Sequence, residues 1–141
     1  MTTETAVVEV SRHLSAAPEQ VFDAWFDAAS LGRWLFATPD GVMERVEVDP
    51  RVGGRFEIDE RRGEEVARHW GTYVEIERPR RLAFDFGTSF EATPTRVIVT
   101  IEADGDGSRL TLRHEGVWTD WQDRTRQGWT MILDGLAKIL G

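Results

Sequence analysis

The chain of 141 residues carries a formal net charge of −8, and 40% of its residues are hydrophobic, which suits one domain with its own apolar core. The acidic balance argues against nucleic acid and anionic membranes as partners, because both attract basic surfaces. The sequence has no cysteine, which excludes disulfides, thiol catalysis and cysteine-bound metal. Residues 1–5 lack the basic and apolar segments of a signal peptide, so we expect one cytoplasmic domain over residues 1–141.

The N-terminal part predicts one strand followed by two short helices. Residues 6–14 are β-branched and roughly alternating, which is typical of a strand. Pro18 suits the first turn of a helix, where its missing N–H costs nothing. The apolar stripe of that helix is Val21, Phe22, Trp25 and Phe26. Asp27 and Ser30 are candidate caps of a second helix, and its inward residues are Leu31, Trp34 and Leu35.

From Met43 to Val117 the apolar residues recur with a period of two, which is typical of antiparallel strands with one face in water. Turn residues at 50–54, 61–64, 79 and 104–107 separate about six such strands. Residues 104–107 read Asp-Gly-Asp-Gly, which predicts a tight hairpin.

The last third of the chain predicts a long helix. Thr119 and Gln122 have the spacing of a capping box, which marks the helix start. Its apolar stripe consists of Trp129, Ile132, Leu133, Leu136, Ile139 and Leu140. A sheet crossed by a helix of roughly 30 Å must curve around it. We therefore predict an α+β fold: a curved antiparallel sheet of about six to seven strands around a long C-terminal helix, with two short helices after the first strand.

Several motifs accompany this order of elements. They are the helical pair at 18–34, Gly53–Phe56, Gly71–Ile76 leading to Pro79, Ser108–Leu112, and Gly128 with Trp129. On these motifs the chain resembles the helix-grip, START-like or SRPBCC superfamily, and within it the branch similar to the activator of heat-shock-protein ATPase. Members of that superfamily bind lipids, hormones or polyketides, cyclise aromatic precursors or assist chaperones. The resemblance therefore implies the fold and leaves the function open.

The strongest functional signal is a set of aromatic and polar side chains predicted to face the C-terminal helix. Flat rings with a few polar groups suit a planar apolar ligand. The set is Phe56, Trp70, Phe84, Phe86, His114, Trp118, Trp121 and Trp129, with Tyr73 as a further orienting group. Our leading hypothesis is a protein that binds a small hydrophobic or aromatic molecule there without a catalytic step. The plainer interpretation is ordinary core packing.

His114 alternates in phase with Leu110 and Leu112, which places its imidazole on the apolar side. It is therefore the candidate general acid or base of the second hypothesis, a cyclase, dehydratase or hydrolase using the same cavity. A buried structural histidine is the alternative. His69 precedes Trp70, and the sequence leaves open which of the two faces the interior; His13 falls on the solvated phase.

Arg55 and Glu57 flank Phe56 in the strand after the double glycine. They are surface charges if Phe56 faces the interior. They would become a polar anchor for a ligand if the register were shifted by one residue.

We expect neither metal nor cofactor. The three histidines are dispersed, and a calcium-loop pattern that begins at Asp104 carries Arg109 where that loop needs glycine. Nucleotide-binding and nucleophile motifs are absent. The third functional hypothesis is a stress-response or chaperone-associated interaction module, and an uncovered edge strand could also support a homodimer. All basic residues except Lys138 are arginine, which we interpret as the codon bias of a GC-rich bacterial genome.

Overall fold

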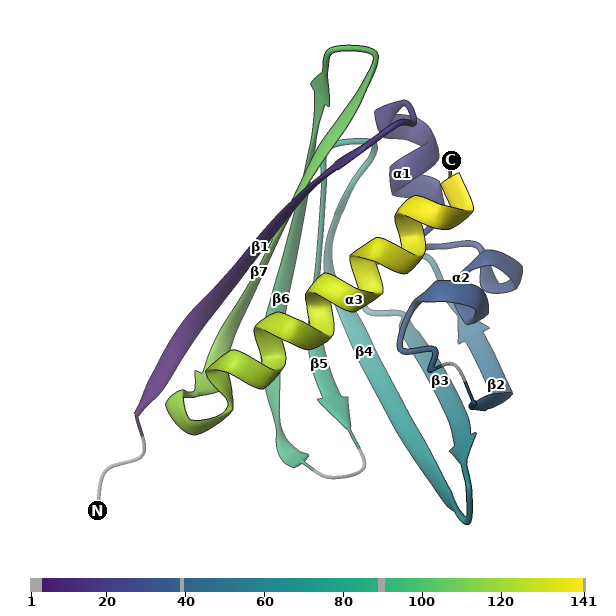
Figure 1. Ribbon diagram of the computed structural model, residues 1–141, viewed down its shortest axis with the longest axis vertical. Coiled ribbons are helices and arrows are strands. Elements are labelled where there is room, and N and C mark those ends of the chain that lie inside the picture. The colour runs from purple at the N-terminus through teal and green to yellow at the C-terminus, as the bar shows by residue number, and fades with distance from the viewer. Residues whose placement is uncertain (1–3, 39, 89–90, 141) are drawn as a thin grey trace.

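The computed structural model describes residues 4–38, 40–88 and 91–140 (Figure 1). It has two layers, an antiparallel sheet and the helices that cover one of its faces. The elements are β1 (Thr5–Leu14), α1 (Pro18–Asp23), α2 (Ala28–Trp34), β2 (Val42–Val48), β3 (Arg55–Arg62), β4 (Glu65–Glu77), β5 (Arg81–Thr88), β6 (Glu91–Asp104), β7 (Gly107–Trp118), the 3₁₀ turn η1 (Thr119–Trp121) and α3 (Gln122–Leu140).

The sheet has seven strands in the order β1-β7-β6-β5-β4-β3-β2, and α3 crosses it diagonally (Figure 1). Strands β2 to β7 follow one another as a meander, and β1 joins the sheet beside β7. The predicted fold class is therefore confirmed. No helix in the described part of the chain is both long and apolar enough to cross a membrane.

The local sequence explains where the short elements begin and end. Pro18 is the first residue of α1, as predicted. Asp27 caps α2, since its carboxylate accepts a hydrogen bond of 3.2 Å from the Ala29 N–H. The hairpin at 104–107 is also present, and Gly105 supplies the left-handed residue of its two-residue loop with φ of 61°.

The predicted capping box at Thr119 is wrong. Helix α3 begins only at Gln122, after the 3₁₀ turn, and the described residues include no hydrogen bond from the Gln122 N–H to the Thr119 side chain. The Gln122 N–H instead donates to the Thr119 backbone carbonyl. The 3₁₀ turn thus satisfies the N–H group that the box would have served.

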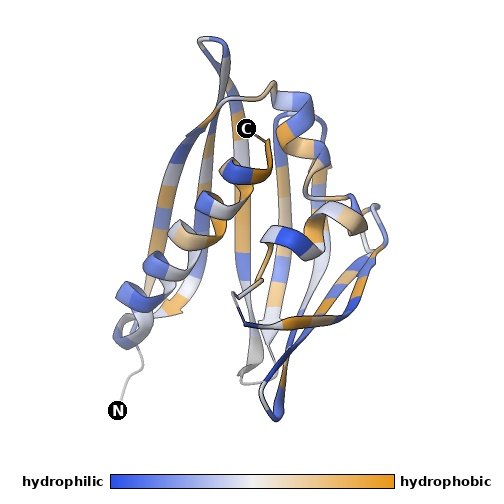
Figure 2. Cartoon of the chain, turned by 45° about the vertical axis from the view of Figure 1, so that its right-hand side comes forward, coloured by the Kyte–Doolittle hydropathy of each residue, from blue (hydrophilic) through white to orange (hydrophobic). Residues whose placement is uncertain are grey.

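The apolar core lies between the sheet and the three helices. Strands show alternating hydrophobic and hydrophilic bands, as one buried face requires (Figure 2). Helix α3 buries Trp129, Leu133 and Leu136 against the core, while Trp25 and Trp34 enter it from the α1–α2 region. The helix stripe predicted from the sequence therefore faces the sheet.

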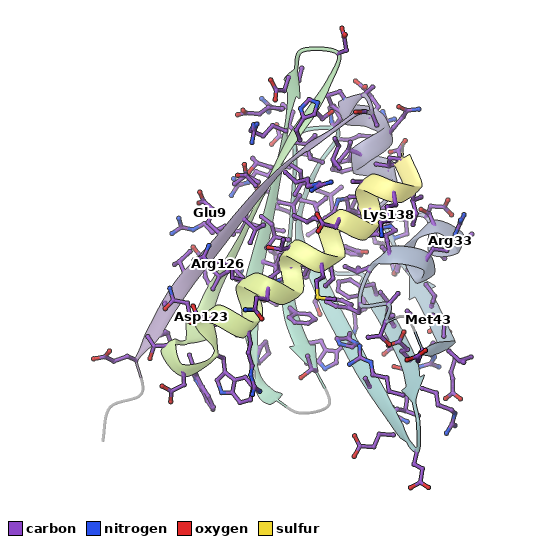
Figure 3. The ribbon with its side chains drawn as sticks, viewed as in Figure 1. Glu9, Arg33, Met43, Asp123, Arg126 and Lys138 are labelled. Atoms are coloured by element: carbon purple, nitrogen blue, oxygen red, sulfur yellow. The ribbon has the colours of Figure 1, made fainter. Side chains whose placement is uncertain are left out.

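One edge strand of the sheet, β1, is tied to α3. The Arg126 guanidinium donates a hydrogen bond of 2.8 Å to the Glu9 carbonyl, and Figure 3 shows the two residues side by side. Arg12 and Asp134 add an ion pair of 2.7 Å between the same elements. The other edge strand is β2. The homodimer stays a prediction.

We predict that Leu133→Ala lowers the free energy of unfolding by about 3 kcal/mol, because it empties a buried site beneath α3. Met131→Ala on the same helix should change it by less than about 0.5 kcal/mol, since Met131 is 68% exposed. Urea unfolding of both variants measures the difference. Equal losses would show that the buried face of α3 is misassigned.

Candidate functional site

Six of the nine residues predicted for the site face the interior between the sheet and the helices. They are Phe56, Tyr73, Phe84, Phe86, His114 and Trp129. Directly opposed residues of antiparallel strands share a face of the sheet. Tyr73 is paired with Phe84, and Gly71 with both Phe56 and Phe86, so one register brings these rings to the same side.

Trp70 lies on the opposite face of the sheet, so the prediction that it faces α3 is wrong. It pairs with Glu57 and Gly87, one residue out of phase with Gly71. Its ring covers Gly87 so closely that no Cβ would fit there, and the Arg55 guanidinium lies 5.1 Å from the ring centroid. Alternation along β4 thus turns His69 inward and Trp70 outward.

The outer face around Trp70 is polar. Arg55 is exposed there, and Glu57 forms a 2.6 Å ion pair with Arg45, which confirms the placement of Arg55 and Glu57 as surface charges. A half-open hollow of about 330 Å³ is lined by Arg45, Glu57, Asp59, Arg68, His69 and Trp70. Paired charges on its wall make it a poor match for an apolar ligand.

Trp118 and Trp121 also differ from the prediction, since they are 48% and 47% exposed. They belong to the end of β7 and to η1, and both precede the first residue of α3. The apolar stripe of the helix therefore does not include them. The Arg124 guanidinium stacks on the exposed Trp121 indole, with 4.9 Å between its carbon and the ring centroid.

His114 joins α3 to the sheet through a buried hydrogen-bond chain. The Trp129 indole N–H donates to His114 Nδ1 at 3.0 Å, and His114 Nε2 lies 2.7 Å from the Thr95 hydroxyl. Because Nδ1 accepts, the neutral imidazole carries its proton on Nε2 and donates it to Thr95. Burial lowers the pKa of His114 to about 4. Both ring nitrogens are engaged, so this geometry favours a structural histidine over a general acid or base.

His69 belongs to a stack of nearly parallel rings. Its centroid lies 4.2 Å from that of Phe36, with 6° between the planes, and Phe36 lies 5.1 Å from Phe86 at 12°. Phe36 is also 5.7 Å from Trp129, so its ring bridges α3 and the sheet. Burial, with the nearby Arg62 charge, lowers the pKa of His69 to about 4.

The segment that carries Phe36 is held by two residues of β3. Arg62 Nη2 donates to the Phe36 carbonyl at 3.1 Å, while the Thr38 N–H and hydroxyl donate to Glu60 at 2.8 and 2.9 Å. Glu60 is only 1% exposed, and Arg62 Nε donates to it at 2.6 Å. Burial alone would raise the pKa of Glu60, but the hydrogen bonds from Thr38 and Arg62 outweigh it and lower the pKa.

Several buried polar atoms of the interior have no hydrogen-bond partner among the described residues. They include Nε1 of Trp25, Nε1 of Trp34, the Tyr73 hydroxyl and Nδ1 of His69. The Trp25 and Trp34 rings lie 4.7 Å apart, and Phe84 is 6.5 Å from both Trp25 and Tyr73. Burial raises the pKa of the Tyr73 hydroxyl, so it stays protonated. Each unpaired buried group costs about 1–3 kcal/mol.

Sequence reasoning missed Phe36 and its anchors. Glu60 shares the phase of Phe56 and Ile58 along β3, so an acidic residue on an apolar face was a readable signal. Phe36 gave none. Its left-handed backbone, with φ of 59°, is the conformation that glycine or asparagine would normally mark.

His69 and His114 both lie against the Phe86 ring, with centroid distances of 6.2 and 5.8 Å. His13 pairs with Asp104 at 3.1 Å in a half-exposed contact, away from the other two. In the described ranges, no group of three or more His, Cys, Asp or Glu residues is placed to hold a metal ion.

A curved antiparallel sheet with one long C-terminal helix across its aromatic interior defines a helix-grip protein. The chain belongs to the family of activator of Hsp90 ATPase homolog 1-like proteins, whose model matches residues 15–141. This match confirms the family to which the sequence motifs pointed.

Solved structures of bacterial proteins share the fold. Protein CV1439 from Chromobacterium violaceum is 25% identical with a TM-score of 0.85, covering 95% of this chain and 96% of its own. SA2116 from Staphylococcus aureus, a protein of unknown function, is 17% identical with a TM-score of 0.87 over 98% and 94%. CalU16 from Micromonospora echinospora is 24% identical with a TM-score of 0.71 over 100% and 87%. A search among curated proteins gives no match.

We predict that the protein loses stability between pH 7 and pH 5. His69 and His114 have a folded-state pKa of about 4 against an ordinary value of 6.5, so the unfolded chain binds more protons in this window. Their contribution is therefore present above about pH 6.5 and is lost as the pH falls toward 4. Urea unfolding should give a free energy about 2 kcal/mol lower per histidine at pH 5 than at pH 7.

His69→Phe keeps a flat ring beneath Phe36 and should remove about half of this loss. His13→Gln is the control and should retain the loss, because it leaves the His69 and His114 rings in place. The lowered pKa of Glu60 changes the stability mainly below pH 4.5, the ordinary pKa of this group, which is outside the range from pH 7 to pH 5. A stability that is flat from pH 7 to 5 would contradict the neutral, buried state of both rings.

Proposed function

We propose that the protein binds a small, mainly apolar molecule between the curved sheet and the helices, without a catalytic step. The observation that carries this proposal is the set of buried polar groups without a protein partner. A core made only of packed side chains would leave the Trp25, Trp34 and Tyr73 donors unsatisfied, although each of these residues is only 2% exposed.

These donors indicate which polar groups the proposed ligand carries. An indole N–H can only donate a hydrogen bond, so the partner must supply an acceptor such as a carbonyl or ether oxygen. The core around these donors consists largely of aromatic rings, including Phe56 and Phe84. Burial of ligand carbon against them would contribute roughly 25 cal/mol per Å². The proposal is thus a small hydrophobic or aromatic ligand with at least one acceptor atom.

An enzyme in the same interior is less well supported. The cyclase, dehydratase or hydrolase hypothesis relied on His114 as acid or base. The Nδ1 lone pair of His114 is taken by Trp129, and its Nε2 lies against Thr95. A substrate would have to break one of these bonds before it could exchange a proton with the ring.

A second candidate function is a chaperone-associated interaction module. The observations that favour it are the family description and the exposure of Trp118 and Trp121. Exposed indoles at the junction of β7 and α3 resemble interaction sites more than core residues. The double substitution Trp118→Ser and Trp121→Ser should weaken binding to a purified chaperone while leaving ligand binding intact.

We predict that 2-acetylnaphthalene raises the melting temperature more than 2-ethylnaphthalene, which has a similar shape but no acceptor oxygen. Tyr73→Phe should reduce the preference for the ketone about fivefold, the value of one hydrogen bond near 1 kcal/mol. The ligand-free variant should be as stable as the original protein or more so, because an unpaired buried hydroxyl is gone.

Trp70→Phe is the matched control, since it alters an aromatic residue on the outer face and should leave both affinities unchanged. Thermal-shift titration and calorimetry with the two naphthalenes make the comparison. Failure of the protein to bind either compound, or equal affinity for both, would count against the proposed site.

A further inference from the structure

Phe36 has an unusual backbone for the place it fills. It follows α2 and adopts φ of 59°, a left-handed conformation that is costly for a bulky residue, yet its side chain is only 7% exposed. The surrounding contacts must therefore hold it there. Arg62 binds its carbonyl, and Glu60 binds Thr38 two residues further on. These anchors are side chains, so displacing Phe36 breaks no bond between strands of the sheet.

The rings beneath Phe36 form a flat platform. His69 on β4 and Phe86 on β5 lie 6.2 Å apart with only 10° between their planes. Phe36 lies nearly parallel to both, whereas Trp129 closes the space from α3 at 58° to the Phe36 plane. The ring of Phe36 thus occupies a slot between the helix and the sheet whose floor suits any planar aromatic group.

Nδ1 of His69, a polar atom at this platform, has no partner in the described part of the chain. Phe36 covers the imidazole but offers it only hydrocarbon. A heteroatom or hydroxyl at the edge of a bound ring would satisfy this nitrogen, which a phenyl side chain cannot do.

We infer that a planar aromatic ring of the ligand stacks on His69 and Phe86 in the place that Phe36 fills in the free protein, so that binding expels Phe36. This inference rests on the proposed ligand-binding function and names its substrate class: planar aromatic molecules rather than flexible lipids. Strain at φ of 59° assists the exchange, since it is relieved when Phe36 leaves.

The Phe36→Gly variant tests the exchange, because glycine accepts a positive φ without strain and removes the competing ring. If the slot is open in less than a tenth of free molecules, the variant should bind 2-acetylnaphthalene at least about tenfold more tightly. 1-Acetyladamantane carries the same ketone on a non-planar body and should gain less. His69→Leu in the Phe36→Gly background should remove the gain. Phe26→Leu, which alters an aromatic residue against Tyr73, is the matched control and should show none.

NMR of the unaltered protein gives a second readout that does not depend on the folding of any variant. Nuclear Overhauser contacts between the Phe36 and His69 rings should disappear on saturation with 2-acetylnaphthalene, and contacts from the ligand to His69 and Phe86 should replace them. If the ketone binds while the Phe36–His69 contacts persist, or if Phe36→Gly binds it no more tightly, the inference is overturned and the proposed function stands. If neither protein binds the ketone, both are overturned.

Discussion

The hydrogen bond from Trp129 to His114 fixes how the long helix sits on the sheet. It is a buried polar contact between α3 and β7, and it joins two groups that the sequence places 15 residues apart. A helix with only an apolar stripe can rotate or slide by small steps at little cost, whereas an N–H that must meet one nitrogen cannot. The rotation of α3, and with it the orientation of Leu133 and Leu136 against the sheet, follows from that pair.

This bond also decides the chemistry of the interior. It sets the tautomer of His114, with the proton on Nε2, and burial keeps both His114 and His69 neutral. The interior therefore contains hydrogen-bonding groups but no buried positive charge from either imidazole at neutral pH. Such a lining suits an uncharged ligand with a few polar atoms, and it gives a carboxylate little to pair with.

Much of the fold could be predicted because the spacing of apolar residues determines the strands, the long helix and their buried faces. The period of two from Met43 to Val117 and the stripe of α3 gave the sheet and the helix that crosses it. The site was harder. His69 and Trp70 are both amphipathic aromatic residues, and only the pairing of β4 with β3 and β5 decides which one turns inward. Thr119 fitted a capping pattern, but its backbone carbonyl, rather than its side chain, accepts the hydrogen bond from the Gln122 N–H. Phe36 depends on tertiary anchors from β3, which no local pattern contains.

Family membership leaves the reaction or ligand undecided, because the fold is shared more widely than any one activity. The interior of this chain holds three indoles, a tyrosine and two neutral histidines around a set of phenylalanines. Any functional assignment must rest on these residues rather than on the sheet that carries them.

The tie between Arg126 and the Glu9 carbonyl has a consequence for how copies of this chain could assemble. It occupies one backbone acceptor on β1, so another extended strand would have to displace Arg126 to pair there. Strand pairing between copies would then use β2, the other edge strand, more readily. If copies paired through β2 alone, two of them related by a two-fold axis would form a closed dimer rather than a filament.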